Sequence, residues 1–391
     1  MDKLKSFFKR FSFFYSVHDC IQEVKKIFII ALVKIMGKFV NQTCDIPVLK
    51  ALKHISDIRE ETEQNYVENS LCIDSQIDLS IIVPIYNAER FLEKCLDSIQ
   101  KQVTNYRYEV ICINDGSTDE SCEILKKYEN DSKFIIYHQS NRGHSGARNQ
   151  ALDFVLGKYL MFVDSDDFIN ENYVESLLKK AYETSSDIVQ SNYCKCNAES
   201  RILKQYLYED KVYAGYMDYA CFSGAPWGRI YRSSLWNGVR FPEGMMFEDA
   251  IIFNVVFRRC NYITVCSKAN YYYRIYGNNT INKLRDDPRR LDAVWSVKYS
   301  LELSSHLGIQ NTFDYYEFLL WQCSRHVYYR TKRFPIVTQK MCFIIMCDII
   351  HMYKQTMIDN GVLHDALLIE LDKCFSQRNF WSWKTCSKIY K

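Results

Sequence analysis

The sequence is poor in the residues that interrupt regular structure, with 13 glycines and 6 prolines among 391 residues. It has no low-complexity segment and no internal repeat, which excludes collagen-like and solenoid proteins. Charge of one sign is also missing, because 50 basic residues face 47 acidic ones and the net charge is +3. Nucleic-acid binders carry a strong basic footprint. We therefore expect a globular protein without a nucleic-acid partner.

The 16 cysteines lack the spacing of a metal or redox motif. No Cys-x-x-Cys pair occurs, and the closest pair, Cys194 and Cys196, has no Cys or His partner at zinc spacing. We interpret the cysteines as small buried side chains in a reducing compartment. No secretory signal is visible, so we expect a cytoplasmic protein.

A long apolar run is absent as well. The run at residues 27–33 is broken by Lys34, so it falls short of the ~20 residues that span a bilayer. Residues 1–15 form a basic amphipathic stripe, and Phe380–Trp383 lie among lysines near the other end. Such segments either lie in a membrane interface or pack on the protein itself. Peripheral contact with the inner face of the cell membrane and self-association as a homo-oligomer both stay open.

Short apolar, β-branched segments alternate with helical periodicity from Ile77 onward. Asn87 is the expected N-cap of the first helix, and Ser117 with Glu120 predicts a capping box for the second. The expected strands cover residues 79–84, 108–113, 134–137, 159–163 and 187–193. The expected helices cover residues 92–99, 117–128, 147–156 and 170–183.

This alternation predicts a parallel, doubly wound α/β sheet, whose ligands bind beyond the carboxyl ends of the strands. After about residue 205 the pattern indicates a mixed sheet, and from Pro288 it is mostly helical. We therefore divide the chain into an N-terminal helical extension (1–76), an α/β domain (77–285) and a C-terminal helical region (286–391).

Polar segments follow four of the expected strands. Each has an ordinary explanation: Asp115 precedes a glycine in a turn sequence, and Gly143–Arg148 reads as a helix entry. Together they favour a binding site, because glycines and an arginine at a helix N-terminus can hold a diphosphate. The four segments are Pro84–Asn87, Asn114–Asp119, Ser140–Asn149 and Asp164–Asp167.

The sharpest of these segments is Asp164–Asp167, with three carboxylates in four residues. Like charges so close resist burial unless a cation or solvent compensates them. Hard oxygen ligands suit Mg²⁺ or Mn²⁺. An EF-hand is excluded because Phe168 and Ile169 stand where a ligand and a glycine belong, and no dinucleotide-binding or P-loop motif is present.

In this order and spacing, four segments resemble the family 2 glycosyltransferases over about residues 78–280: Ser80–Asn87, Asn114–Asp119, Gly146–Asn149 and Asp164–Asp167. The resemblance implies an α/β fold of the GT-A type, a Rossmann-like mixed sheet flanked by helices, here with N-terminal and C-terminal helical additions. It also implies an inverting glycosyltransferase of bacterial polysaccharide synthesis.

The resemblance further implies the donor site. Asp166 would ligate Mn²⁺ or Mg²⁺ directly. Asp164 is the second residue of the metal site, and its main contact would be with the ribose of the nucleotide. Asp115 would accept a hydrogen bond from the base, and Asp167 is left as a helix-entry residue. The implied donor-binding residues are Pro84, Tyr86, Asn87, Glu89, Asp115, Gly146, Arg148, Asp164 and Ser165.

The family places its catalytic base in a later Glu-Asp pair, which Glu248 and Asp249 match at the start of an apolar helix. Asp249 is the implied base and Glu248 an acceptor-side residue, although both could simply complement the helix dipole. Trp227 would stack on an acceptor sugar, with a core position as the alternative. Arg274, near Asn278–Thr280, would belong to a loop that closes over the donor and would offset diphosphate charge.

The implied reaction moves a sugar from a nucleotide-sugar donor, UDP by family habit, to a hydroxyl of a saccharide or lipid-linked saccharide. Two other functions stay open. One is a nucleotide-sugar-binding scaffold without catalysis. The other is a nucleotidyltransferase with a similar sheet, which would normally show a glycine-rich loop after the first strand. Here that loop is Pro84–Asn87.

Overall fold

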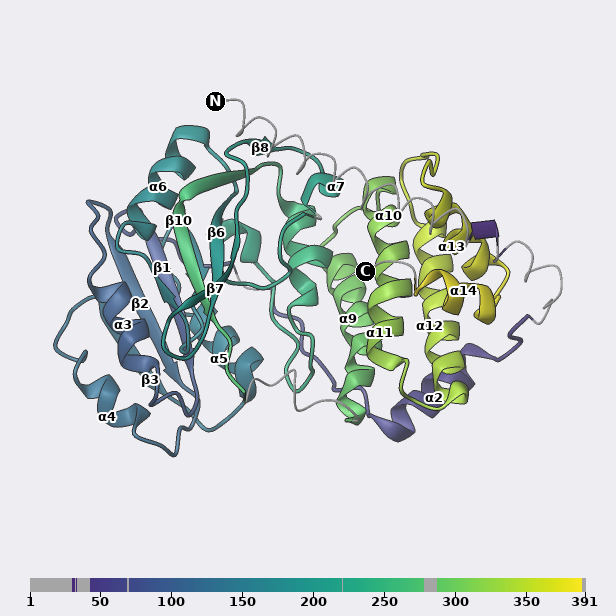
Figure 1. The fold of residues 1–391 in the computed structure, drawn as a ribbon, viewed down its shortest axis with the longest axis horizontal. Helices are drawn as coiled ribbons and strands as arrows, with labels where there is room; N and C mark the ends of the chain where they lie inside the picture. Colours follow the sequence, from purple (N-terminus) through teal and green to yellow (C-terminus); the bar gives the residue numbers. More distant parts are fainter. Residues whose placement is uncertain are drawn as a thin grey trace, which may run out of the picture. The chain divides into compact units, whose positions relative to one another are not determined.

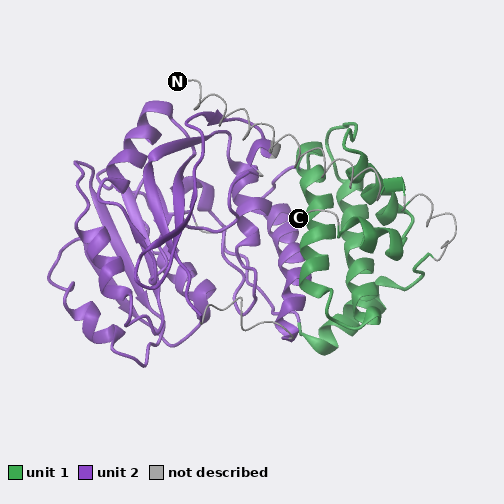
Figure 2. Ribbon diagram, viewed as in Figure 1, with its two compact units in different colours: residues 1–60, 311–391 green, residues 61–310 purple. Residues whose placement is uncertain are grey.

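The computed structural model describes residues 43–388 except 69, 220 and 278–286, together with residues 30, 31 and 33. The basic stripe at 1–15, most of the run 27–33, and Asn278–Thr280 lie outside the described residues. The chain forms two compact units, one of residues 61–310 and one of residues 1–60 with 311–391 (Figure 2). We call them the sheet unit and the helical unit.

This division differs from the three regions drawn from the sequence, because the two ends of the chain share one unit. Helix α2 (Val48–Ile58) buries Ala51 and Ile55 and packs against α12 (Ile336–Gln355). Residues 61–76 belong instead to the sheet unit, where Glu61 pairs with Lys298 at 2.7 Å. An amphipathic helix needs an apolar partner surface, and for α2 that surface comes from the far end of the sequence.

The sheet unit is built on a 10-stranded sheet in the order β3-β2-β1-β4-β9-β6-β10-β5, with β7 paired to β6 and β8 paired to β10 (Figure 1). The strands are β1 (Leu79–Ile85), β2 (Tyr108–Asn114), β3 (Phe134–His138), β4 (Tyr159–Phe162), β5 (Phe168–Ile169), β6 (Ile188–Cys196), β7 (Ile202–Tyr206), β8 (Val212–Tyr213), β9 (Arg229–Arg232) and β10 (Ile263–Arg274).

Strands β1 to β4 run parallel, which confirms the alternation seen in the sequence. β9 lies antiparallel between β4 and β6, and β6 is parallel to β10. The sheet is therefore mixed, as the resemblance implied, and not parallel throughout. The change of direction falls beside β4, the strand that carries the acidic run at its carboxyl end.

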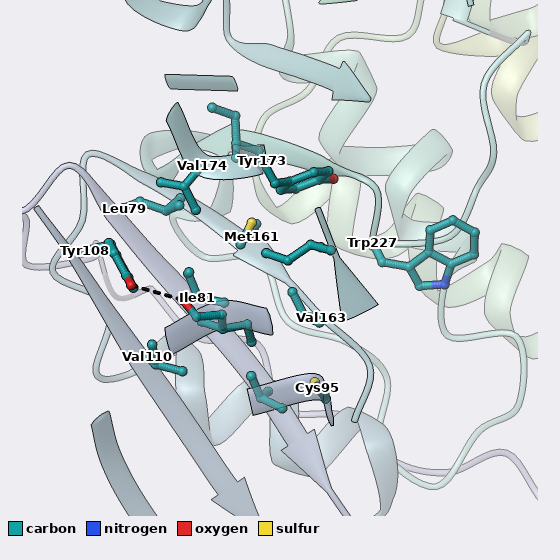
Figure 3. Packing of buried hydrophobic residues seen from close by; sticks show 14 of the residues in the cluster. Leu79, Ile81, Cys95, Tyr108, Val110, Met161, Val163, Tyr173, Val174 and Trp227 are labelled. Atoms are coloured by element: carbon teal, nitrogen blue, oxygen red, sulfur yellow. Dashed lines mark hydrogen bonds between the residues drawn. The ribbon is translucent and has the colours of Figure 1, made fainter. Parts of the chain in front are cut away.

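One face of the sheet carries the main hydrophobic core (Figure 3). Alternate β1 residues such as Ile81 and Val83 point into it, because side chains along a strand alternate between faces. They pack with α3 (Leu92–Gln100) and α6 (Tyr173–Thr184). The Tyr108 hydroxyl donates to the Ile99 carbonyl at 3.0 Å, which ties β2 to α3.

Several expected helix ends were wrong. Asn87 has φ 48° and does not cap α3, which begins at Leu92. The capping box at Ser117 does not form either, because α4 (Ser121–Lys126) begins four residues later. In both cases a contact between neighbouring loops replaces the local cap. Helix α5 (Gly143–Leu152) begins four residues before the expected start at 147, so the segment expected to bind diphosphate is itself the first helical turn.

The remaining helices divide between the units. In the sheet unit these are α7 (Tyr216–Tyr219) and α9 (Asp292–His306). In the helical unit they are α10 (Phe313–Trp321), α11 (Val327–Thr331), α13 (Ala366–Ser376) and α14 (Phe380–Cys386), which surround α12 together with α2.

Helix α12 is the single candidate membrane span among the described residues, with a mean hydropathy of 1.3 in its most apolar window. Of that window, 61% is buried inside the protein. Phe343 is fully buried against Phe375, Phe380 and Trp383. This packing is typical of a core helix and gives no support to a spanning role.

Candidate active site

The loops that follow β1 and β2 are joined to each other at the carboxyl edge of the sheet. The Asn87 side-chain oxygen accepts from the Thr118 amide at 2.8 Å, and the Ser117 hydroxyl accepts from the Asn87 amide at 3.1 Å. The Glu89 carboxylate accepts from the amide of Glu120 at 3.0 Å, at the start of α4. Asn87 and Glu89, both implied donor-binding residues, therefore hold the two loops in place.

The remaining residues of these loops differ in accessibility. Pro84 is buried inside β1 opposite Ile113, whereas Tyr86 is 49% exposed just beyond the strand. Asp115 is 2% exposed, and one of its oxygens accepts from the Gln139 side chain at 2.7 Å and from the Arg142 amide at 2.8 Å. Asp115 thus joins the loop after β2 to the entry of α5.

The entry of α5 is closely packed around Gly146. A Cβ atom there would lie 2.3 Å from Cβ of Arg142, so no larger side chain fits without movement. The Arg142 guanidinium pairs with Glu243 at 2.7 Å, and the Asn149 amide also donates to Glu243 at 3.2 Å. The close approach of Arg142 therefore requires glycine at position 146, independently of any role in donor binding.

Arg148 on α5 connects two acidic segments that are far apart in the sequence. Its guanidinium lies 2.9 Å from Asp164 and 3.0 Å from Glu248, which is 100 residues away. The side chain is 4% exposed. Burial alone would lower the pKa of Arg148, but the two carboxylates outweigh burial and raise it. Arg148 therefore stays charged and fixes the position of the Glu248–Asp249 pair relative to the acidic run.

The acidic run after β4 is held mainly by β10 and the residues just after it. The Tyr276 hydroxyl donates to Asp166 at 2.9 Å, and the Tyr271 hydroxyl donates to Asp167 at 2.7 Å. The backbone amide of Arg274 donates to Asp167 at 2.7 Å. Asp167 is fully buried, so it is a structural residue of the site and not simply a helix-entry residue.

Burial and mutual repulsion make the charged forms of the carboxylates in this run unfavourable. Burial raises the pKa of Asp166, and the charge of Asp164 raises it further. Burial and the charges of Asp166 and Asp164 raise the pKa of Asp167 well above its usual range. Asp164 is tied to Arg148, while Ser165 beside it is partly exposed. A bound cation would relieve this repulsion.

The residues present fit a divalent cation in one limited sense. No group of three His, Cys, Asp or Glu side chains with ligand geometry occurs among the described residues. Asp164 and Asp166 nevertheless supply hard oxygen donors from one short loop, and their charges interact. Mg²⁺ is often held by one or two carboxylates while substrate phosphates and water complete its ligands. The donor set thus suits a metal that binds with a phosphorylated substrate.

The Arg274 side chain, which the resemblance to the family places on the acceptor side, is buried within the protein. It is 1% exposed, and its guanidinium donates to the carbonyls of Asp166 and Ala198 at 2.7 and 2.8 Å. It also lies over the ring of Phe91, 4.4 Å from the centroid. Arg274 therefore stabilises the backbone of the acidic run through its hydrogen bond to Asp166.

The segment that carries the expected base has an unusual backbone. Phe247, directly before Glu248, has φ 63°, a left-handed conformation that costs a bulky residue on the order of 1–3 kcal/mol. Asp249 is partly exposed, and its carbonyl accepts from the Ile252 amide at 3.0 Å. The apolar residues that follow form a short π-helical segment, Ile252–Val256. Such local strain occurs preferentially at functional sites.

Trp227 takes the core position that the sequence left open. It is 8% exposed and stacks on Tyr271 and Tyr273 with centroid distances of 4.7 and 5.0 Å. Its ring is therefore largely covered by protein.

Sequence reasoning missed three residues of the site: Glu243, Tyr271 and Tyr276. Tyr271 and Tyr276 contact carboxylates of the acidic run, and Glu243 contacts Arg142, which directly precedes α5. The run of tyrosines before Arg274 gave a partial signal, because alternate residues of a strand share a face. Nothing in the sequence indicated which face meets the acidic run.

Comparisons with known proteins agree with this geometry. A family model described as glycosyl transferase family 2 matches residues 80–238. Glycosyltransferase GlyA of Streptococcus pneumoniae is 36% identical over 246 residues, which cover 59% of this chain and 33% of GlyA. The uncharacterized glycosyltransferase EpsJ of Bacillus subtilis is 30% identical over 249 residues, which cover 59% of this chain and 71% of EpsJ.

A solved structure shares the fold. Residues 1–349 of TarS from Staphylococcus aureus, crystallised with UDP-GlcNAc, superpose with a TM-score of 0.57 at 21% identity. The match covers 80% of this chain and 91% of that structure. TarS is named a poly(ribitol-phosphate) β-N-acetylglucosaminyltransferase. The match to GlyA spans only a third of GlyA's length, whereas most of EpsJ is covered. The chain belongs to glycosyl transferase family 2 and has its GT-A fold.

Proposed function

We propose that the protein is a metal-dependent, inverting glycosyltransferase that uses a nucleotide-sugar donor, with UDP as the nucleotide. The observation that carries this proposal is the bridge through Arg148. It joins Asp164 of the acidic run to Glu248, the neighbour of Asp249, with distances of 2.9 and 3.0 Å. A donor-binding carboxylate and the residue next to the candidate base are thereby held on one buried cation.

On the donor side, Asp166 and Asp164 would hold Mn²⁺ or Mg²⁺ together with the diphosphate of the donor. Such a metal would supply positive charge to the departing nucleoside diphosphate. Asp115 and the loop around Tyr86 lie at the carboxyl end of the neighbouring strands, where the base and ribose would bind. The UDP-GlcNAc bound to TarS supports UDP as the nucleotide.

On the acceptor side, Asp249 would accept the proton of an acceptor hydroxyl. The oxygen would then attack the anomeric carbon from the face opposite the diphosphate, so that the anomeric configuration inverts. A hydroxyl is a poor nucleophile until its proton is removed, and a positioned carboxylate contributes typically ~10²–10⁴-fold to such a step. Glu248, fixed by Arg148, would set the position of Asp249.

The acceptor would be a saccharide or a lipid-linked saccharide used in surface polysaccharide synthesis. This reaction would take place in the cytoplasm, at the inner face of the cell membrane when the acceptor is lipid-linked. The names of the relatives support a glycan product, because TarS transfers a sugar to a poly(ribitol-phosphate).

The two other functions are less consistent with the site. A binding scaffold without catalysis gives no role to the strained backbone before Glu248. A nucleotidyltransferase would be expected to cradle a triphosphate with a glycine-rich loop after β1. That loop contains no glycine and is tied to the next loop through Asn87 and Glu89.

Donor binding with and without metal tests the proposal directly. We expect UDP-sugars to raise the melting temperature of the full chain when Mn²⁺ is present, and EDTA to remove that increase. Asp166→Ala should lose the metal-dependent part of the increase. Glu123→Ala, a 61% exposed carboxylate of α4, serves as a control. Equal Mn²⁺ and UDP-sugar affinities in Asp166→Ala and the unmodified protein would rule out the metal role.

A further inference from the structure

A row of aromatic side chains crosses three strands next to the acidic run. Tyr271, Tyr193 and Tyr206 are paired across β10, β6 and β7, so their side chains lie on one face of the sheet. Tyr193 and Tyr206 stack at 4.3 Å and nearly parallel, and Trp227 contacts both Tyr193 and Tyr271. At its inner end the Tyr271 hydroxyl bonds to Asp167. The row therefore begins at the acidic run.

The row becomes more accessible with distance from that end. Tyr271 is fully buried, whereas Tyr193 and Tyr206 are partly exposed. Beyond them, residues 202–205 of β7 are exposed. In the described part of the chain β7 pairs with β6 alone, so the outer side of this ribbon is a sheet edge.

The next row on the same face is cationic. Tyr273 on β10 pairs with Lys195 on β6, and Lys195 pairs with Lys204 on β7. Because these positions lie two residues from the first row, they face the same way. The ammonium groups of Lys204 and Lys195 lie 4.6 and 5.4 Å from the centre of the Tyr206 ring.

These two lysines differ from a third lysine of the same region. Lys211 lies 4.6 Å from the centre of the Tyr213 ring and 3.8 Å from the carboxylate of Glu209. Lys195 and Lys204, in contrast, contact the Tyr206 ring and have no carboxylate partner among the described residues. Burial acts to raise the pKa of Tyr206, but the two lysines outweigh it and lower the pKa. The region around Tyr206 is therefore locally positive.

We infer that this face binds the acceptor and that the acceptor is an anionic saccharide chain. Sugar rings present an apolar C–H face that packs on aromatic rings, and the partly exposed rings of Tyr206 and Tyr193 offer such a surface. Carboxylate or phosphate groups of the chain meet Lys195 and Lys204. Three strands spaced ~4.8 Å apart give a track of roughly 10 Å, which suits a chain better than a single sugar. The inference rests on the proposed function.

Binding of short saccharides to the full chain tests this surface. The probes are trigalacturonate, a ribitol-phosphate trimer and neutral galactotriose, each titrated at low and high salt. The first two distinguish carboxylate from phosphate as the source of the negative charge. We expect at least one anionic trimer to bind more tightly than the neutral one, with an affinity that falls as salt increases.

Variants place the binding on this face. Lys195→Gln with Lys204→Gln should weaken anionic-trimer binding about tenfold, the combined effect of two solvent-accessible charges. Tyr206→Ala should weaken binding of trigalacturonate and galactotriose, whose sugar rings pack on the tyrosine. Lys211→Gln is the matched control and should bind like the unmodified protein. Circular dichroism of each variant verifies folding.

The outcomes separate this inference from the proposed function. Unchanged affinity in the double lysine variant, or no preference for anionic trimers, overturns the anionic-acceptor surface. UDP-sugar binding measured in parallel tests the donor site. Donor binding without any trimer binding overturns this inference alone. Absence of donor binding overturns the proposed function and, with it, the assignment of this face to an acceptor.

Discussion

The two units differ in how they treat buried charge. In the described part of the helical unit, the buried charged side chain is Glu370, and the core is aliphatic, aromatic and cysteine-rich. The sheet unit buries many more charged groups. These are Glu109, Asp115, Arg148, Asp167, Arg229, Arg240, Arg274 and Asp292.

A buried charge is destabilising unless it is paired and hydrogen-bonded, and even a good pair is often no better than an apolar substitute. Arg148, Asp167 and Arg274 are nevertheless gathered around one acidic run. The difference indicates that the sheet unit keeps these charges for its site. The helical unit has a core optimised for packing. Four predictions test this contrast, from the largest effect to the smallest.

Asp249→Asn should affect chemistry without affecting either core. The variant cannot accept a proton, so the rate of UDP-sugar hydrolysis by water should fall by about 10²–10⁴-fold, the usual contribution of a general base. UDP-sugar affinity should stay the same. Asp218→Asn, an exposed residue of α7, is the control. Near-normal hydrolysis by Asp249→Asn would remove this residue from the mechanism.

Phe343→Ala should reduce the stability of the helical unit without affecting the chemistry. The side chain is fully buried among Phe375, Phe380 and Trp383, so its removal should leave a cavity and cost about 3–5 kcal/mol of stability. Met352→Ala, 59% exposed on the same helix, should cost much less. Peptide-resolved hydrogen exchange would assign the loss to the helical unit. Equal losses in the two variants would contradict a tightly packed core.

Arg148→Met should destabilise the sheet unit by about 3 kcal/mol, because it leaves Asp164 and Glu248 without their buried counter-charge. Arg142→Met removes a guanidinium that is 45% exposed and paired with Glu243, so we expect a cost of about 0–1 kcal/mol. Urea unfolding followed by hydrogen exchange measures both. Similar losses of unfolding free energy in the two variants would show that the buried Arg148 ion pairs contribute no more to stability than the exposed Arg142 ion pair.

His326 should make the helical unit sensitive to acid. Burial, followed by the charges of Arg330 and Arg325, lowers the pKa of His326 to about 4 from an ordinary value of 6.5. The folded state resists protonation. The residue nevertheless keeps an exposed surface, which screens the effect, so stability should fall by less than about 1 kcal/mol as pH decreases from about 6.5 through about 4. His326→Gln should lose this dependence of the unfolding free energy on pH. His351→Gln, on the exposed side of α12, should retain it. Identical slopes would refute the assignment.

Much of the sheet could be predicted because its strands are unambiguous. β1 was expected at 79–84 and spans Leu79–Ile85, with every residue buried. A short apolar, β-branched run between turn sequences has few other stable environments. The polar segments after β1, β2 and β4 were likewise expected at one edge, which parallel pairing confirms.

The helix ends failed for a physical reason. Asn87 and Ser117 have the side chains of helix caps, but a cap is a local bond that competes with any other acceptor or donor nearby. Here the two loops bond to each other, with Asn87 accepting from Thr118 and Ser117 accepting from Asn87. Sequence propensity cannot rank a local bond against one that forms only when two strands come together.

By itself the sequence determined the strand–helix alternation, the family and the placement of the acidic run after β4. These features depend on local periodicity and on short motifs, which are read along the chain. Only the tertiary structure decided which carboxylates are buried and which are paired. Asp167 is a structural residue because Tyr271 and Arg274 of β10 donate hydrogen bonds to it. Glu248 belongs to the site because it pairs with Arg148, 100 positions earlier in the sequence. The electrostatics of a charge depend on its neighbours in space, which the order of residues does not specify.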